Sequence, residues 1–228
     1  MSKKMRITVI SLLSVVFAVS VGFLVKDYCD SKMQAELYDN LIETVEDTDD
    51  TEDTMSYSED KNFLPDYQEL YMQNNDMVGW IKVEDTKINY PVMQSKDNPN
   101  FYLRHGFDKG YTVYGCPYVQ ENCDVDIPSD NLIIYGHNMK NNTMFGSLPK
   151  YSKQEYYEEH SVLYLLTPKQ NYKVKLIAGY VTPSDSKVYE FEKTKEERSG
   201  LLKTALDNSL FTSGTTVSDE DRLLTLST

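Results

Sequence analysis

A run of 19 uncharged and mostly apolar residues near the amino terminus constrains this chain more than any other feature of its sequence. The run covers residues 7–25 (ITVISLLSVVFAVSVGFLV). A helix of about 20 such residues is long enough to cross the hydrocarbon core of a bilayer. Lys3, Lys4 and Arg6 precede the run, and acidic residues follow it. By the positive-inside rule, we expect residues 1–6 to form a cytoplasmic tail and everything beyond the helix to be extracellular.

A cleaved signal peptide is the alternative interpretation of residues 7–25. The apolar core of a signal peptide spans only about 7–15 residues and precedes a cleavage site of small residues. The run in this chain is longer, and no clean A-x-A site follows it. These differences favour an uncleaved signal anchor that crosses the cell membrane once.

The net charge of −13 is concentrated in one segment after the apolar run. Residues 27–60 contain 13 acidic side chains and only one basic side chain, Lys32. Residues 43–60 have almost no large apolar side chains, so they cannot bury enough surface to offset the entropy lost on ordering. We therefore expect residues 26–60 to be an acidic extracytoplasmic stalk. Apolar residues at helical spacing between positions 37 and 45 allow the membrane helix to continue into it for a few turns.

The charge also bears on the partners of the chain. A nucleic-acid-binding protein carries a basic patch or stripe, whereas this chain is acidic overall and its body, residues 61–228, is only mildly acidic. We therefore predict no nucleic-acid partner.

Residues 61–228 have the pattern of a single, mainly β domain. Short runs of β-branched and aromatic residues alternate with turn residues, which is typical of an all-β barrel or sandwich. The expected strands are Gly79–Val83, Ile88–Met93, Asn131–Tyr135, Val162–Thr167, Tyr172–Tyr180 and Arg222–Ser227. The expected helices are Asp66–Met77, Ser152–His160 and, the longest of them, Glu192–Leu210.

Three histidines are candidates for proton transfer. His160 lies in a charged helical stretch and is by default a surface residue, whereas His105 lies in a turn-like segment that favours a structural or surface role. His137 follows Gly136 and the apolar strand before it, where a buried strand emerges into a loop. Loops at strand ends present reactive groups on a rigid scaffold. From this position alone, a catalytic histidine and a hydrogen-bonded structural histidine are equally good interpretations.

The three cysteines do not define a metal site. Cys29, Cys116 and Cys123 lack the paired C-x-x-C spacing of zinc sites, and no H-E-x-x-H helix occurs, so we expect no metal or other cofactor. Cys29 follows the apolar run and is interpreted as an unpaired thiol. Cys116 and Cys123 either close a small disulfide loop, which an oxidising exterior permits, or remain buried or free thiols. Nothing around them favours a nucleophile partnered by His137 over simple packing.

Several segments together resemble one protein family. The run SDNLIIYGHNM at residues 129–139, followed by MFGSLPKY at residues 144–151, resembles the histidine segment of class B sortases. Further segments resemble the same class, in the same order along the chain: residues 74–94, 97–107, 192–210 and 221–228. The resemblance implies that residues 61–228 are a sortase B-like catalytic domain. It implies a sortase-like closed β-barrel with an N-terminal helix and a long helix between late strands, preceded by one transmembrane helix.

The resemblance breaks at the carboxyl end. DRLLTLST at residues 221–228 resembles the strand leading to the nucleophile, which in the family reads T-L-S-T-C. The expected cysteine would follow Thr228, and the family's arginine lies on the strand after it. The resemblance thus implies a chain truncated before its nucleophile with its last strand missing, and a missing strand leaves an open sheet edge. None of the three cysteines lies at the matching position.

The family resemblance also implies a reaction. Class B sortases are membrane-anchored cysteine transpeptidases of Gram-positive bacteria, in which a thiolate attacks the threonine carbonyl of a C-terminal sorting motif and a cell-wall amine resolves the thioester. By this resemblance, His137 is the catalytic acid/base, Ser227 and Thr228 line the substrate groove, and Asn98 is a weaker match to a groove position. The implied partners are surface proteins with such a motif and a peptidoglycan precursor amine.

The resemblance predicts that the polypeptide of 228 residues has no transpeptidase activity, because the cysteine and the arginine are not among its residues. Several explanations remain open: a stop codon after that of Thr228, a UGA there that is read through or decoded as selenocysteine, or an incomplete sequence. The alternative function is a membrane-tethered module that binds sorting peptides without cleaving them.

Overall fold

The structure is a computed structural model that describes residues 2–46, 65–125, 129–190, 194–218 and 221–228. The chain forms two compact units, Met1–Glu43 and Thr44–Thr228. Residues 47–60 of the acidic segment predicted to be a stalk lie outside the described residues.

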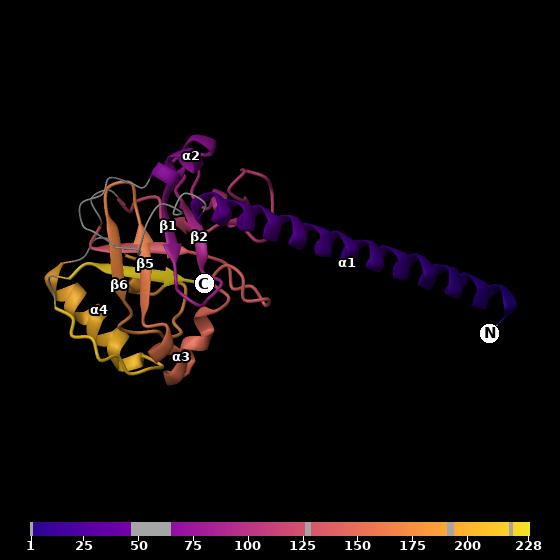
Figure 1. Cartoon of the computed structure of the whole chain (residues 1–228). Coiled ribbons are helices and arrows are strands. Elements are labelled where there is room, and N and C mark those ends of the chain that lie inside the picture. The colour runs from indigo at the N-terminus through magenta and orange to yellow at the C-terminus, as the bar shows by residue number, and fades with distance from the viewer. Residues whose placement is uncertain (1, 47–64, 126–128, 191–193, 219–220) are drawn as a thin grey trace. The chain divides into compact units, whose positions relative to one another are not determined.

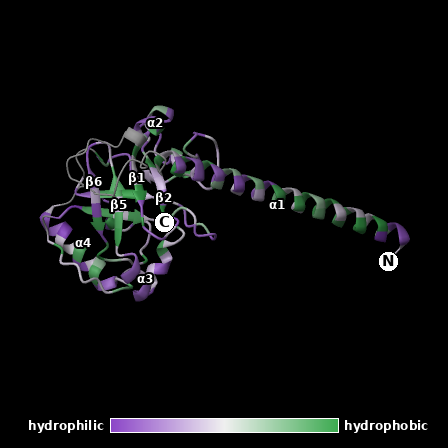
Figure 2. Cartoon of the chain, viewed as in Figure 1, coloured by the Kyte–Doolittle hydropathy of each residue, from purple (hydrophilic) through white to green (hydrophobic). Residues whose placement is uncertain are grey.

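The amino-terminal unit is a single helix, α1, which runs from Lys3 to Glu46 without a break (Figure 1). The helix continues 20 residues beyond Lys26, which confirms the predicted extension of the apolar helix. The large side chains of residues 7–25 are exposed, and the hydrophobic colour in Figure 2 follows a hydrophilic first turn. Ser14 and Ser20 donate their hydroxyl hydrogens to carbonyls four residues back, so no polar group of theirs is left unsatisfied. By length and composition α1 suits a bilayer span, a property that a signal sequence shares.

The second unit contains a seven-stranded sheet in the order β6–β5–β1–β2–β3–β4–β7. Neighbouring strands are antiparallel, except that the β2–β3 and β4–β7 pairs are parallel. In Figure 1 the sheet curls so that β6 and β5 cross in front of the yellow strand β7. The strands are β1 Met77–Lys82, β2 Asn89–Met93, β3 Tyr118–Val119, β4 Asn131–Tyr135, β5 Val162–Leu166, β6 Asn171–Lys175 and β7 Leu223–Ser227.

Short helices and turns connect the strands. The α-helices are α2 Pro65–Gln73, α3 Gln154–Glu159 and α4 Lys195–Asn208, and the 3-10 helices are η2 Phe101–Leu103, η3 Leu148–Ser152 and η4 Lys187–Tyr189. Helix α4 begins with a capping box, in which the Thr194 hydroxyl accepts from the Glu197 N–H and the Glu197 carboxylate accepts from the Thr194 N–H. This reciprocal cap fixes the first turn of the longest helix of this unit.

Two predicted elements end earlier than the sequence pattern suggests. The helix expected at Asp66–Met77 ends at Gln73. The Asn74 side-chain oxygen accepts from the Asp76 N–H two residues further on, and Met77 already belongs to β1. The strand expected at Tyr172–Tyr180 ends at Lys175. Beyond it, the chain turns toward the segment after α4, where the Gly179 carbonyl accepts from the Leu210 N–H.

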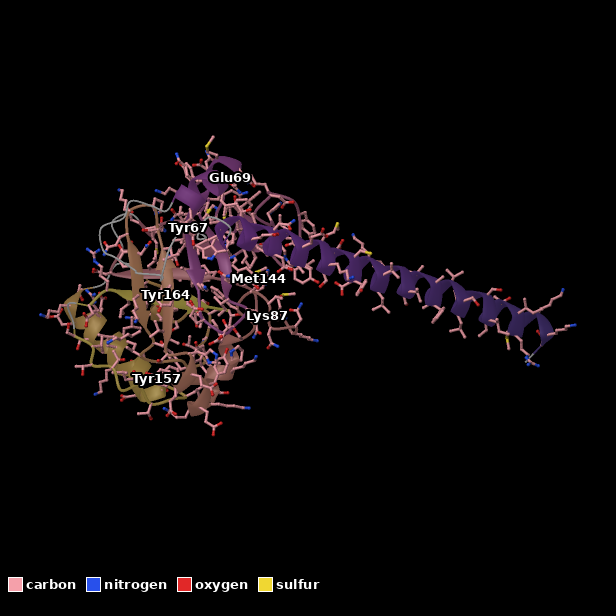
Figure 3. The ribbon with its side chains drawn as sticks, in the orientation of Figure 1. Tyr67, Glu69, Lys87, Met144, Tyr157 and Tyr164 are labelled. Atoms are coloured by element: carbon pink, nitrogen blue, oxygen red, sulfur yellow. The ribbon has the colours of Figure 1, made fainter. Side chains whose placement is uncertain are left out.

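The interior of the sheet is filled by side chains from several elements. Trp80 of β1 is buried and packs edge-on against Tyr67 of α2, with ring centroids 5.6 Å apart. Its indole N–H donates to the Asn89 side chain at 2.6 Å, so the polar edge of the ring is satisfied. In Figure 3, Tyr67 and Met144 are buried positions, whereas Glu69 on the same helix as Tyr67 is exposed. Helix α2 therefore packs on the sheet through one face.

The two edges of the sheet face a common cavity. Among the described residues β6 pairs only with β5 and β7 only with β4, and residues of both edges line a cavity of about 790 Å³. Leu201 and Leu202 of α4 complete its wall. All five side chains of β7 are only half-buried, although three of them are leucines. The barrel predicted to be closed is thus nearly closed, with its gap between β6 and β7.

Amide hydrogen exchange along β7 will show which side of this strand is paired. The Leu223 N–H donates to Asp130, and the Ser227 carbonyl accepts from Gly136, so residues 223, 225 and 227 direct their backbone groups toward β4. The N–H groups of Leu224 and Leu226 point the other way. We expect these two amides to exchange about 100-fold faster than those of Thr225 and Ser227. Equal protection along the whole strand would contradict an open edge.

Candidate functional site

The candidate site lies where β4 and β7 end side by side. Their parallel register pairs Tyr135 with Ser227, and the Gly136 N–H donates to the Ser227 carbonyl at 2.9 Å. His137, the next residue, therefore emerges beside Thr228. Three of the residues implicated by the sequence, His137, Ser227 and Thr228, are brought to one edge of the barrel although about 90 positions separate them in the chain.

Glycine is required at the position before His137. A Cβ atom on Gly136 would lie 2.6 Å from the ring of Phe145, which is fully buried. The Phe145 N–H in turn donates to the His137 carbonyl at 2.9 Å. The backbone on both sides of the half-buried His137 is thus held, so the imidazole projects from a rigid turn.

The His137 ring makes one hydrogen bond that sequence reasoning missed. Its Nε2 atom lies 2.7 Å from the Leu103 carbonyl oxygen. A carbonyl only accepts, so Nε2 carries the proton in this contact and Nδ1 is the ring nitrogen left to accept one. Every residue has a backbone carbonyl, so the sequence gives no signal for this contact. The family resemblance only included Leu103 within the matching segment 97–107.

Asn98 is not brought into this arrangement by any contact of the described residues. It lies exposed in the turn before η2, and its carbonyl accepts from the Phe101 N–H at 3.0 Å. Its assignment to a groove position therefore stays a prediction.

The other two histidines have structural contacts. The Nδ1 atom of His105 lies 2.7 Å from the Phe101 carbonyl, and the two rings stack with centroids 3.9 Å apart. His160 is half-buried at the end of α3, where its Nδ1 lies 2.9 Å from the Tyr156 carbonyl. The default surface assignment of His160 was therefore incomplete, because its ring packs on Tyr156 as part of the helix end.

Neither cysteine of the barrel unit lies at this site in a reactive setting. Cys116 and Cys123 are both buried and no disulfide joins them, so of the two alternatives left open by the sequence the structure has buried thiols. Their thiols donate to the carbonyls of Pro91 and Asn131, each at 3.5 Å. Burial raises the pKa of the Cys123 thiol, which opposes formation of the nucleophilic thiolate.

A small polar cavity of about 290 Å³ adjoins the end of β7. The Ser227 hydroxyl donates to the Tyr189 hydroxyl at 3.2 Å, and the Tyr189 ring stacks with Tyr135 at 6.1 Å between centroids. Burial, with Tyr189 nearby, raises the pKa of Tyr135 to about 12, so this hydroxyl stays neutral. The lining residues are Tyr135, Thr182, Ser184, Tyr189, Ser227 and Thr228. Hydroxyls and aromatic faces of this kind suit a short stretch of peptide. Tyr189 and Thr182 line this cavity, and the sequence did not reveal them.

Metal-ligating side chains do not gather in the part of the chain that the structure describes. No group of three or more histidine, cysteine, aspartate or glutamate side chains there has the spacing to hold a metal ion.

Seven strands in a nearly closed barrel, preceded by a long apolar helix and with α4 before the last strand, define a sortase-like fold. The structure of the Staphylococcus aureus sortase B–substrate complex has a TM-score of 0.78 and 27% identity, covering 87% of this chain and 88% of that one. The crystal structure of sortase B complexed with triglycine has a TM-score of 0.77 and 26% identity, covering 86% and 88%.

Curated sequences give the family. The sortase B of Listeria monocytogenes is 35% identical over 206 residues, covering 86% of this chain and 82% of the relative. The sortase B of Staphylococcus aureus is 28% identical over 231 residues, covering all of this chain and 91% of the relative. No protein-family model matches the chain. The chain belongs to the sortase B family of transpeptidases, which confirms the family implied by the sequence segments.

Thiol titration of the native full chain in detergent micelles tests the assignment of the cysteines. We expect Cys29, which is exposed, to react quickly with a thiol reagent. The two buried thiols should react at least about 100-fold more slowly, because they must wait for local opening. All three thiols should react after denaturation. Rapid reaction of a second native thiol, lost in a Cys116→Ser or Cys123→Ser variant, would contradict this assignment.

Proposed function

We propose that the barrel binds the C-terminal sorting motif of a surface protein at the ends of β4 and β7, with His137 as the catalytic acid/base. The parallel pairing that puts His137 beside Thr228 is the observation that carries this proposal. The cavity beside Ser227, with its hydroxyls and stacked tyrosines, supports a peptide ligand. Among relatives of similar fold, one is a substrate complex of sortase B and another is complexed with triglycine.

The chemistry that this edge supports is acyl transfer through a thioester. A thiolate attacks the carbonyl carbon of the motif threonine, the peptide nitrogen departs with a proton, and an attacking amine later expels the sulfur and loses a proton. The Nδ1 atom of His137, which the contact of Nε2–H with Leu103 leaves unprotonated, can take the proton of the thiol, pass it to the departing nitrogen and later take one from the attacking amine. The triglycine complex of a relative supports an amine on the cell-wall precursor as the acceptor.

The same geometry supports the proposal that these 228 residues alone do not carry out the transfer. Cys116 and Cys123 are buried against backbone carbonyls, and Cys29 belongs to α1, outside the barrel strands. Neither of the two barrel cysteines lies at the end of β7. Loss of a catalytic nucleophile lowers turnover by about 10⁶-fold in enzymes whose side chains act as a unit.

The residues before the barrel fit a protein that is anchored in the cell membrane through its amino-terminal helix. We propose that residues 1–6 are cytoplasmic, that residues 7–25 span the membrane and that residues 26–60 hold the catalytic domain, residues 61–228, outside the cell. The uninterrupted, exposed apolar part of α1 supports the span, and the three basic residues ahead of it support the orientation.

A transpeptidation assay with a sorting peptide and triglycine tests this function. We expect no turnover by the 228-residue polypeptide. A chimera should form product if it carries, after Thr228, the segment that follows the matching strand in the Listeria monocytogenes relative. His137→Ala in the chimera should lower the rate by at least about 10³-fold, because proton transfer is lost. Product formation by the unextended polypeptide that His137→Ala abolishes would overturn its proposed inactivity.

Binding of the same peptide separates the catalytic function from the alternative, a tethered module that binds sorting peptides. The cavity beside Ser227 exists without any nucleophile, which favours retention of binding. A fluorescent sorting peptide that binds the unextended polypeptide, and binds it less well after Tyr189→Ala, supports the module. Absence of binding to both the polypeptide and the chimera would contradict the proposed peptide site itself.

A further inference from the structure

The 3-10 turn η2 is held through three successive carbonyl groups. The Phe101 carbonyl accepts from the His105 ring at 2.7 Å, and the Tyr102 carbonyl accepts from the Cys116 N–H at 2.9 Å. The Leu103 carbonyl accepts from His137 Nε2 at 2.7 Å. Each partner comes from a different position in the chain, so the turn has little freedom to rotate or shift. The last of the three contacts is the one that orients the candidate acid/base.

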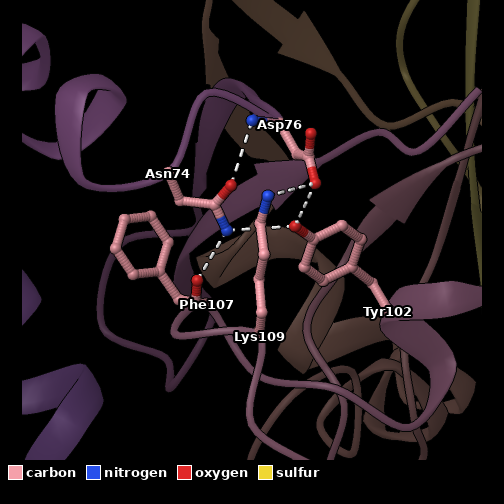
Figure 4. A network of polar contacts seen from close by, with 5 residues as sticks. All are labelled: Asn74, Asp76, Tyr102, Phe107 and Lys109. Carbon is pink, nitrogen blue, oxygen red and sulfur yellow. Dashed lines mark hydrogen bonds and ion pairs between the residues drawn. The ribbon is translucent and has the colours of Figure 1, made fainter.

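The side chain of Tyr102 anchors this turn in a buried polar network (Figure 4). The ring is 1% exposed, and its hydroxyl donates to Asp76 Oδ2 at 2.7 Å and accepts from Asn74 Nδ2 at 3.0 Å. Burial and the hydrogen bond to Asp76 raise the pKa of Tyr102 well above its ordinary value, so the hydroxyl remains a neutral donor. Lys109 lies 3.0 Å from the same Asp76 oxygen and balances its charge.

The network also closes around the segment that follows the turn. Asn74 Nδ2 donates to the Phe107 carbonyl at 2.6 Å, and Asn74 is itself only 3% exposed. On the other side, Gly115 adopts a positive φ of 61°, and a Cβ atom there would lie 2.6 Å from the Tyr102 carbonyl oxygen. A glycine in the left-handed region thus lets a second backbone segment press directly on the turn.

We propose that Tyr102 is a positioning residue for His137. Its hydroxyl, held between Asp76 and Asn74, fixes the turn so that the Leu103 carbonyl keeps the proton on Nε2 and leaves Nδ1 to exchange protons with the reacting groups. Tyr102 itself acts only through the backbone of the turn and has no contact with the imidazole among those described. The proposal deepens the proposed function, since it rests on His137 as the acid/base.

If the network around Tyr102 had a purely structural role, removing the Tyr102 hydroxyl would lower stability without changing the His137 imidazole. Loss of the Tyr102 hydroxyl removes one hydrogen-bond partner from Asp76 and one from Asn74. Loss of a buried tyrosine hydroxyl that is hydrogen-bonded lowers stability wherever it occurs in a protein. A positioning role adds a local effect on the imidazole that a similar loss elsewhere does not produce. Tyr151 offers the matched control, since it is 5% exposed and its hydroxyl donates to the His160 carbonyl at 2.7 Å.

Nitrogen-15 NMR of the histidine side chains in the full chain tests this directly, in detergent micelles at about pH 8.5, above the ordinary titration range of imidazole. In the unchanged protein we expect His137 to show a protonated Nε2 and an unprotonated Nδ1. In Tyr102→Phe, the Nε2 proton should exchange with solvent at least about 10-fold faster, which corresponds to a weakening of about 1.4 kcal/mol. In Tyr151→Phe, the His137 signals should not change.

Each result decides the proposal. A proton on Nδ1 of His137 in the unchanged protein overturns it without any variant. Unchanged His137 signals in Tyr102→Phe, with stability lost to the same extent as in Tyr151→Phe by urea unfolding, also overturn it. If Tyr102→Phe does not fold, Asp76→Ala takes its place, because it removes the acceptor of the Tyr102 hydroxyl and keeps the buried ring. Faster exchange in that variant supports the proposal, and unchanged exchange contradicts it.

The NMR signals of His137 test the positioning role of Tyr102 separately from the proposed function. The NMR signals require no turnover, so a chimera without activity would leave the positioning of His137 intact and count only against the proposed reaction. In an active chimera, Tyr102→Phe should lower kcat by at least about 10-fold with little change in KM, since peptide contacts are untouched.

Discussion

The parallel pairing of β4 with β7 is the constraint on which the rest of the site depends. Five residues of each strand are in register, from Asn131 with Leu223 to Tyr135 with Ser227. This ladder joins β4, which leads to His137, with β7, which lies about 90 residues later in the chain. Asn131 to Ile134 of β4 are all buried, and a shift of the β4–β7 register by one residue would move His137 away from Thr228.

The imidazole is held by elements on both sides of this ladder. Gly136 permits the close approach of Phe145, and the Phe145 N–H secures the His137 carbonyl. From the other side the Leu103 carbonyl accepts a hydrogen bond from Nε2–H. The barrel therefore supplies rigidity through its strands and orientation through a turn that the polar network around Tyr102 keeps in place. A catalytic group held in this way loses little entropy when it engages a substrate.

Residue patterns predicted the parts of the fold that depend on continuous apolar runs. The strand Asn131–Tyr135 was predicted with its observed bounds, because four buried residues lie between clear turn signals. Strand β3 was missed, since two residues carry no periodicity, and the helix before β1 was predicted too long because Asn74 ends it with side-chain hydrogen bonds. The sequence could not predict the contact of the Leu103 carbonyl with His137, because it depends on the path of the backbone. For the same reason it could not decide between a disulfide and two thiols at Cys116 and Cys123. The family, by contrast, could be identified from local segments alone.

The hydrogen bond from the Gly136 N–H to the Ser227 carbonyl couples the two strand ends at the site. Scalar coupling across this bond, between the Gly136 amide nitrogen and the Ser227 carbonyl carbon, tests it most directly by NMR of the labelled full chain. We predict a resolved coupling between these two nuclei and slow exchange of the Gly136 amide. Coupling of the Gly136 amide to a different carbonyl, or rapid exchange with solvent, would contradict the register that places His137 beside Thr228.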